Sequence, residues 1–266
     1  MIKARLDVLL VERGLAESRS QAQRLVMAGE VRVNGQVVLK PATGIDLKAA
    51  IEVVGRPRYV SRGGDKLEAA LLAFGVNPSG RICADIGAST GGFTDCLLQH
   101  GAERVYAIDV GKGILDWKLR QDPHVVVMES TNARYLENLP EPVSLVTVDA
   151  SFISLKTFFP VIKGWFTERV GEVIALIKPQ FEAGRALVGR GKGVVRDPLV
   201  HRDVLLGVLR ESKEEGYRLR GLVRSPLLGP KGNAEFLAWL ELGGDSLIDV
   251  DIDEAINAAV GIEERD

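Results

Sequence analysis

The chain has 266 residues, of which 46% are hydrophobic and 26% charged, and a formal net charge of −2. This composition is that of an ordinary globular protein and excludes a disordered or fibrous chain. We expect a cytoplasmic protein, because no apolar run approaches the roughly 18 residues of a membrane span and the first residues lack a signal-peptide pattern. The two cysteines, Cys83 and Cys96, have no metal-ligand spacing, so we expect no metal.

The charge is distributed unevenly along the chain. Residues 1–60 contain ten basic and six acidic residues, whereas residues 241–266 contain one basic and nine acidic residues. A basic front end indicates a polyanionic partner, although only mildly. We expect residues 245–266 to form an acidic tail.

Residues 1–55 are predicted to form a small α+β module. A first helix ends near Gly14, and a second, capped by Ser18, runs from residue 19 to 28. The pair Asn34-Gly35 predicts a hairpin, and residues 44–54 supply a further strand. Residues 56–60 then form a linker.

Basic and polar residues of this module could form one basic face, although their charge is equally consistent with an ordinary solvated surface. The run from Ser18 to Gly35 resembles the RNA-binding module first known from ribosomal protein S4. The resemblance implies that the module binds structured RNA through its phosphates. The candidate residues are Arg5, Arg19, Gln23, Arg24, Arg32 and Lys40.

From residue 61 to 244 the pattern predicts a second, larger α/β domain. Strand and helix patterns alternate, and the last two strands, joined by a short loop, should pair antiparallel. We therefore expect a Rossmann-like, seven-stranded methyltransferase sheet with helices on both faces. The main helices are predicted over 92–100, 154–166 and 198–215. The predicted strands span residues 82–86, 104–109, 125–128, 144–149, 172–177, 218–224 and 235–241.

A glycine-rich turn after the first of these strands predicts a nucleotide site. Dinucleotide turns carry a middle glycine that lets the backbone approach a pyrophosphate, and Ser89 occupies that position here. The turn therefore favours S-adenosylmethionine, which has no phosphate, and disfavours an NAD-dependent oxidoreductase. The candidate cofactor-binding residues of this segment are Asp85, Gly87, Ser89, Thr90, Gly91 and Gly92.

Two further residues follow neighbouring strands at the same edge of the predicted sheet. Asp109 ends the second strand, where a carboxylate can accept hydrogen bonds from two ribose hydroxyls. Asn132 follows the third strand and is a candidate for the adenine edge. The competing interpretations are a helix-capping role for Asp109 and no ligand role for Asn132.

Four charged residues lie at matching ends of predicted elements. Asp149 and Lys178 end the fourth and fifth strands, Glu235 begins the last strand, and Lys66 lies near the start of the helix before the first strand. Taken alone, each residue is as consistent with an ordinary surface charge as with a catalytic role. Together, at the carboxyl edge of one sheet, they predict a catalytic site.

The segments Val60–Gly63, Asp85–Thr94, Ser151–Leu155, Lys178–Glu182 and Gly232-Asn233 resemble the TlyA (hemolysin A) family. That family joins an S4-type module to an FtsJ-like ribose methyltransferase domain. The resemblance implies that Lys66, Asp149, Lys178 and Glu235 form its catalytic Lys-Asp-Lys-Glu tetrad. It also implies S-adenosylmethionine as donor and, as substrate, a cytidine 2′-hydroxyl in ribosomal RNA of the large subunit, and in some members of the small subunit.

The tetrad's residue types suit this chemistry. A ribose hydroxyl must lose its proton as it attacks the donor methyl group, and Lys178 can accept that proton if it is neutral. The carboxylates then hold the lysines and the hydroxyl in line. The alternatives are a non-catalytic RNA-docking factor and, less favoured, a membrane-active hemolysin.

A Gly- and Arg-rich loop lies between residues 181 and 197. Its composition predicts a clamp that binds the RNA backbone through Arg185, Arg190 and Lys192. The sequence leaves the oligomeric state open.

Overall fold

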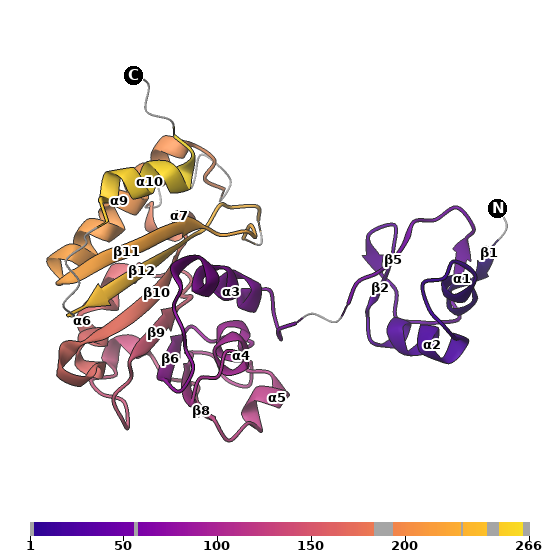
Figure 1. Ribbon diagram of the computed structural model, residues 1–266, viewed down its shortest axis with the longest axis horizontal. Helices are drawn as coiled ribbons and strands as arrows, with labels where there is room; N and C mark the ends of the chain where they lie inside the picture. The colour runs from indigo at the N-terminus through magenta and orange to yellow at the C-terminus, as the bar shows by residue number, and fades with distance from the viewer. Residues whose placement is uncertain (1–2, 56–57, 184–193, 230, 244–249, 263–266) are drawn as a thin grey trace. The chain divides into compact units, whose positions relative to one another are not determined.

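The computed structural model describes residues 3–55, 58–183, 194–229, 231–243 and 250–262 (Figure 1). The chain divides into two compact units, Met1–Arg58 and Tyr59–Asp266. Each unit has its own hydrophobic core. The candidate residues Arg185, Arg190 and Lys192 lie outside the described residues.

The first unit is a small α+β module built on two helices, and its predicted type is confirmed. Ser18 caps the second helix by accepting a hydrogen bond from the backbone N–H of Gln21. Leu6 and Leu10 of the first helix pack with Ala22 of the second in the core. The elements are β1 (Lys3–Arg5), α1 (Leu6–Glu12), α2 (Arg19–Met27), β2 (Val31–Val33), β3 (Gln36–Val37), β4 (Gly44–Asp46) and β5 (Ile51–Val53).

The single strand predicted over residues 44–54 is two strands in different sheets. Strand β4 pairs with β1, whereas β5 pairs with β2. Between them the Asp46 carboxylate accepts a hydrogen bond from the backbone N–H of Lys48, and the Asp46 carbonyl accepts one from Ala49. This Asx turn redirects the chain, because it offers the backbone an alternative to the strand ladder.

The second unit contains the predicted seven-stranded sheet, in the order β11-β12-β10-β9-β6-β7-β8. Strand β12 runs antiparallel to both of its neighbours, β10 and β11, and the short loop before it predicted the pairing with β11. Each strand starts and ends within one residue of its predicted bounds. The strands are β6 (Ile82–Ile86), β7 (Arg104–Ile108), β8 (Val125–Met128), β9 (Leu145–Val148), β10 (Gly171–Ile177), β11 (Tyr217–Arg224) and β12 (Phe236–Leu242).

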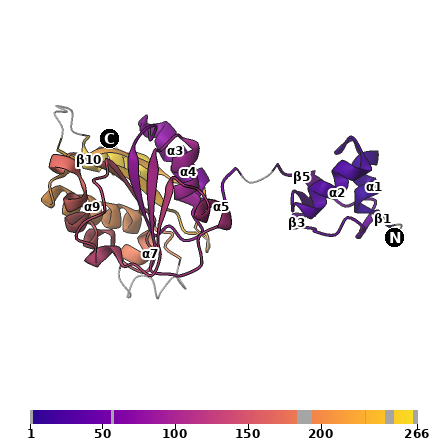
Figure 2. The ribbon, with the colours of Figure 1, turned by 90° about the horizontal axis from the view of Figure 1, so that it is seen from below.

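Helices cover both faces of this sheet, as Figure 2 shows for α3 and α4 on one side and α9 on the other. Alternate residues of β10 enter two separate cores: Ile174 packs with the α3–α4 layer and Ala175 with the α9 layer. The helices are α3 (Gly63–Phe74), α4 (Gly92–Gln99), α5 (Trp117–Arg120), α6 (Phe159–Ile162), α7 (Pro179–Glu182), α9 (Pro198–Glu214) and α10 (Ile252–Val260), with 3-10 turns η1 (Ala133–Tyr135), η2 (Leu155–Thr157), η3 (Lys163–Trp165) and η4 (Thr167–Arg169).

The helix predicted over residues 154–166 is broken into three short pieces, η2, α6 and η3. Pro160 lies in the first turn of α6. Because proline has no N–H and its ring restricts the preceding residue, it cannot continue a helix from η2. A helix therefore restarts there.

The acidic tail predicted from residue 245 contains a packed helix. Helix α10 begins after Asp251, which caps it by accepting from the Glu254 N–H, and buries Ile256 and Val260 against α9 and β11. The apolar residues of this helix recur every three or four positions, a helical pattern that the surrounding acidic residues obscured.

The last two residues of the predicted linker belong to the second unit. Tyr59 is only 2% exposed, and a Cβ at Gly64 would lie 2.1 Å from its ring. The backbone N–H of Val60 donates to the buried Asp95 carboxylate at 2.9 Å. Residues 59 and 60 are therefore anchored beside the start of α3.

Candidate active site

The glycine-rich turn is built around close backbone approaches. Gly87 has a φ of +81°, and a Cβ there would lie 2.7 Å from the carbonyl oxygen of Asp149. At Gly92 a Cβ would lie 2.3 Å from Ser61 Oγ and 2.9 Å from the Gly64 nitrogen. Any side chain at these positions would push the turn away from β9 or from α3.

Two adjoining cavities lie at the carboxyl edge of the sheet and share Gly87, Ser89 and Asp149. The larger, about 380 Å³, lies against Asp109 and Asn132, and the smaller is about 210 Å³. Ligands of open α/β sheets bind at this edge, where the strand order reverses. The smaller cavity is lined by Ser61, Arg62, Gly63, Lys66, Thr90, Gly92 and Phe93, together with the shared residues and Ala88.

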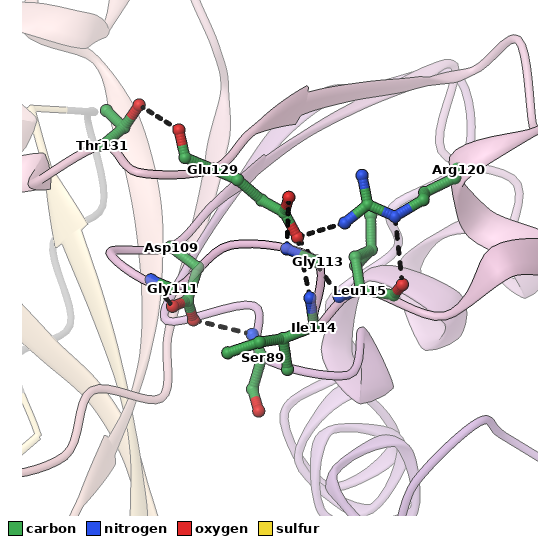
Figure 3. A network of polar contacts seen from close by, with 9 residues as sticks. All are labelled: Ser89, Asp109, Gly111, Gly113, Ile114, Leu115, Arg120, Glu129 and Thr131. Atoms are coloured by element: carbon green, nitrogen blue, oxygen red, sulfur yellow. Dashed lines mark hydrogen bonds and ion pairs between the residues drawn. The ribbon is translucent and has the colours of Figure 1, made fainter.

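Asp109 lies where the sequence predicted it, at the rim of the larger cavity, and Figure 3 shows its contacts. Its carboxylate accepts hydrogen bonds from the backbone N–H groups of Ser89, at 2.8 Å, and Gly111, at 2.7 Å. None of the helices in the described residues has Asp109 as its cap. Instead Asp109 ties the glycine-rich turn to the loop after β7.

Glu129, which the sequence analysis did not single out, shapes the next part of that loop (Figure 3). Its carboxylate accepts from the N–H groups of Gly113, at 2.8 Å, and Ile114, at 3.1 Å, and pairs with Arg120. These backbone hydrogen bonds are the main cause that lowers the pKa of Glu129 to about 2. No motif marks Glu129 in the sequence, because its partners are backbone groups.

Three of the predicted cofactor-binding residues have structural roles. Asp85 is fully buried beneath the turn and lines neither cavity; its carboxylate accepts from the hydroxyls of Thr94, at 2.7 Å, and Thr147, at 3.0 Å. Gly91, which also lines neither cavity, has a φ of +98° at the start of α4. Asn132 lines the larger cavity, but its side-chain oxygen caps η1.

The four charged residues form two ion pairs. Lys66 Nζ donates to Glu235 Oε2 at 2.5 Å, and Lys178 Nζ pairs with Asp149 Oδ1. Lys66, Lys178 and Glu235 are all less than 10% exposed. Because β12 is antiparallel, its first end reaches the same edge as the last ends of β9 and β10. This is why residues so distant in sequence meet.

The two pairs are close enough to influence each other electrostatically. Burial raises the pKa of Asp149, and the positive charges of Lys178 and then Lys66 oppose this rise, whereas Glu235 adds to it. Lys66 and Asp149 also line the smaller cavity together. The structure therefore brings all four predicted residues to one place beside the cavities.

Two further polar residues form hydrogen bonds with members of the tetrad. Ser151 Oγ accepts a hydrogen bond from Lys178 Nζ at 2.9 Å, and Gln180 Nε2 donates to Glu235 Oε1 at 3.4 Å. Neither residue was predicted from the sequence. Both adjoin predicted residues, Ser151 two positions after Asp149 and Gln180 two positions after Lys178, and this adjacency was the available signal.

The predicted RNA-binding residues of the first unit fall into two groups. The side chains of Arg5, Arg19 and Gln23 all donate to the buried carboxylate of Asp7. Within the described residues, the exposed side chains of the remaining three make no hydrogen bond or ion pair. These three are Arg24, Arg32 and Lys40.

None of the helices in the described part of the chain has the length and apolar character that a bilayer crossing requires. In the same residues, no three or more His, Cys, Asp or Glu side chains are placed to hold a metal ion.

Comparisons with known proteins agree with this architecture. Residues 59–242 match the FtsJ-like methyltransferase family, and residues 4–51 match the S4 domain. The 16S/23S rRNA (cytidine-2'-O)-methyltransferase TlyA of Mycobacterium tuberculosis (strain ATCC 25618 / H37Rv) is 46% identical over 263 residues, covering 97% of each chain. Hemolysin A of Brachyspira hyodysenteriae is 44% identical over 242 residues, covering 88% of this chain and 98% of that protein.

A solved structure from Streptococcus thermophilus shares the fold with a TM-score of 0.73 and 44% identity, covering 97% of this chain and 96% of that one. The chain therefore belongs to the FtsJ-like methyltransferase family, in the TlyA branch that carries an S4 domain ahead of the methyltransferase domain.

Proposed function

We propose that this protein transfers a methyl group from S-adenosylmethionine to the 2′-hydroxyl of a cytidine in large-subunit ribosomal RNA, with small-subunit RNA as a second substrate. The observation that carries the proposal is the pairing of Lys66 with Glu235 and of Lys178 with Asp149 beside two joined cavities. The substrate follows from the name of the Mycobacterium tuberculosis relative. Acting on ribosomal RNA, the protein would work in the cytoplasm.

The cavities fit a donor with a nucleoside part and an amino-acid part. Asp109 lies at the larger cavity, where a carboxylate can accept from ribose hydroxyls, and Asn132 lies on the same wall. The smaller cavity adjoins the starts of α3 and α4, whose backbone N–H groups favour a carboxylate. Gly87, where a Cβ would lie 2.7 Å from the carbonyl oxygen of Asp149, lines both cavities.

The tetrad would hold and deprotonate the acceptor. S-adenosylmethionine supplies an electrophilic methyl group on a positively charged sulfur, which becomes a neutral thioether when the carbon–sulfur bond breaks and the oxygen–carbon bond forms. Lys178 Nζ, in its neutral form, takes the hydroxyl proton during attack, while Asp149 and Ser151 fix its direction.

The first unit would supply RNA affinity. Its exposed basic residues suit phosphate contacts, which position a protein on RNA independently of sequence. Arg185, Arg190 and Lys192 of the Gly- and Arg-rich segment would add RNA-backbone contacts, a role inferred from the composition of that segment.

Replacement of Lys178 by Ala tests the proposal. Methyl transfer to ribosomal subunits, measured with labelled donor, should fall by about 10²–10⁴, the usual contribution of a general base, while RNA affinity stays nearly unchanged. Lys156→Ala is the matched control, since Lys156 lies in η2 after β9, pairs with Glu211 instead and lines neither cavity. Activity of Lys178→Ala within a few-fold of the parent would contradict the assigned role.

Mapping of the labelled methyl group on separated subunits would identify the substrate. A wild-type protein that binds ribosomal RNA but transfers no methyl group would support the non-catalytic alternative instead.

A further inference from the structure

A buried carboxylate accepts hydrogen bonds from three of the predicted RNA-binding residues of the first unit. Asp7 is 0% exposed, in the first turn of α1. Arg5 donates to both of its oxygens, from Nε at 3.0 Å and from Nη2 at 2.9 Å. Arg19 Nε and Gln23 Nε2 donate to Oδ2 at 3.1 and 2.9 Å. Three side chains from two elements thus converge on one acid.

The geometry leaves the outer ends of both arginines available. Arg5 and Arg19 are about half exposed, whereas the acid beneath them is not. In the described part of the chain, Nη1 of Arg5 and both Nη atoms of Arg19 make no hydrogen bond. A two-point contact fixes the plane of a guanidinium, so the direction of the remaining N–H groups of Arg5 is fixed as well.

Asp7 is ionised wherever the protein is folded under physiological conditions. The hydrogen bond from Arg5 is the largest of the effects that hold the pKa of Asp7 well below its usual range, and Gln23 and Arg19 lower it further. Asp7 therefore reduces the net positive charge of this face. If only net charge mattered for RNA binding, removing Asp7 would strengthen it.

We propose that Asp7 is a positioning residue for RNA binding: its carboxylate holds Arg5 and Arg19 in the orientation that phosphates meet, and this outweighs the negative charge that it adds. The proposal rests on the proposed RNA-binding function of the first unit. Holding flexible side chains in advance strengthens binding, because less conformational freedom is lost on association. A phosphate-bearing RNA strand is the ligand that outward guanidinium N–H groups suit.

The variant Asp7→Asn distinguishes the orientation of the arginines from the net charge of the surface, because losing the orientation lowers RNA affinity whereas losing the negative charge raises it. Affinity of the full chain for a large-subunit rRNA transcript should fall about tenfold, as expected when two arginines must be ordered during binding. The slope of log affinity against log salt should become shallower by about one to two, because phosphate contacts are lost. An affinity that rises, or a slope that steepens, would overturn the proposal.

Glu12→Gln is the matched control. Glu12 is exposed on the same helix and has no ion pair within the described residues, so this variant removes one negative charge without disturbing the arginines. Its RNA affinity should stay within about twofold of wild type or rise slightly. If Asp7→Asn behaves like Glu12→Gln, charge alone explains both variants and the proposal fails.

A double-mutant cycle shows whether Asp7 acts through the arginines. In a chain with Arg5→Ala and Arg19→Ala, the further change Asp7→Asn should alter RNA affinity by less than about twofold. A tenfold loss that persists in this background would mean that Asp7 supports only the fold of the unit, which refutes the positioning role.

NMR of the wild-type protein without RNA tests the same point independently of any variant. The Nε–Hε signals of Arg5 and Arg19 should be resolved and protected from exchange, whereas that of Arg24, which has no side-chain partner among the described residues, should not. Equal exchange for all three would overturn the proposal. Protected signals in a wild-type protein that does not bind RNA would instead refute the proposed function and leave the role of Asp7 in orienting the arginines intact.

Discussion

The pair of Lys66 and Glu235 allows stability and catalysis to be separated. Replacement of Lys66 by Met leaves the Glu235 carboxylate, 1% exposed, with Gln180 as its remaining side-chain donor among the described residues. Removing one partner of a buried pair costs about 3–5 kcal/mol, because the other charge stays buried without compensation. For a unit of this size that lowers the melting temperature by roughly 6–20 °C.

Glu235→Gln should also destabilise the unit, but combined with Lys66→Met it should recover most of the loss. The double variant buries no unpaired charge, so we expect its free energy of unfolding within about 1–2 kcal/mol of wild type. Methyl transfer should nevertheless stay at least about 10²-fold lower, because the tetrad is incomplete.

Denaturant unfolding and labelled-methyl transfer on the same four proteins measure both quantities. Single variants as stable as wild type would show that the pair is not coupled in the folded state. A double variant that regains activity would show that Lys66 and Glu235 have no part in the chemistry.

Three further predictions concern the glycine-rich turn, the buried Asp85 that precedes it, and the Ser151 hydroxyl that binds Lys178. Gly92→Ala should weaken donor binding at least about tenfold by calorimetry, since its Cβ would meet Ser61 and the Gly64 backbone; unchanged affinity would contradict the assigned pocket. Burial raises the pKa of Asp85 to about 7, from an unfolded value near 4. The free energy of unfolding of wild type, relative to that of Asp85→Asn, should therefore fall between about pH 4 and 7 and then level off. A difference that does not change with pH in denaturant unfolding would contradict this. Ser151→Ala should slow transfer about tenfold with RNA affinity unchanged, and Ser151→Thr should restore it; failure of the Thr variant to do so would contradict a positioning role for the hydroxyl.

The sheet was predictable because its strands are buried on both faces and end in recognisable turns. Apolar runs such as the one before Asp85 have few alternatives in a chain that alternates strand and helix. The antiparallel pairing of the last two strands followed from the short loop between them. The carboxyl-edge rule then placed Asp149, Lys178 and Glu235 together before any distance was known.

What the sequence did not reveal depends on contacts between distant residues or with backbone groups. Asp7 looks like an ordinary acid in the first turn of a helix, and nothing local shows that Arg19 reaches it. Glu129 binds backbone N–H groups, which carry no sequence signature. Pro160 does mark the break in its helix, but the apolar pattern around it concealed the break. Helix α10 was missed because acidic residues dominate its segment.

The burial of Tyr59 determines where this protein can be cut for study. A methyltransferase fragment beginning at Ser61 would lack the ring that covers Gly64 and would remove the Val60 N–H from the buried Asp95. The uncovered patch adjoins the smaller cavity, whose wall includes Ser61 and Gly63. Fragments intended to report the donor affinity of the isolated catalytic unit should therefore begin before residue 59, or they will measure a damaged pocket.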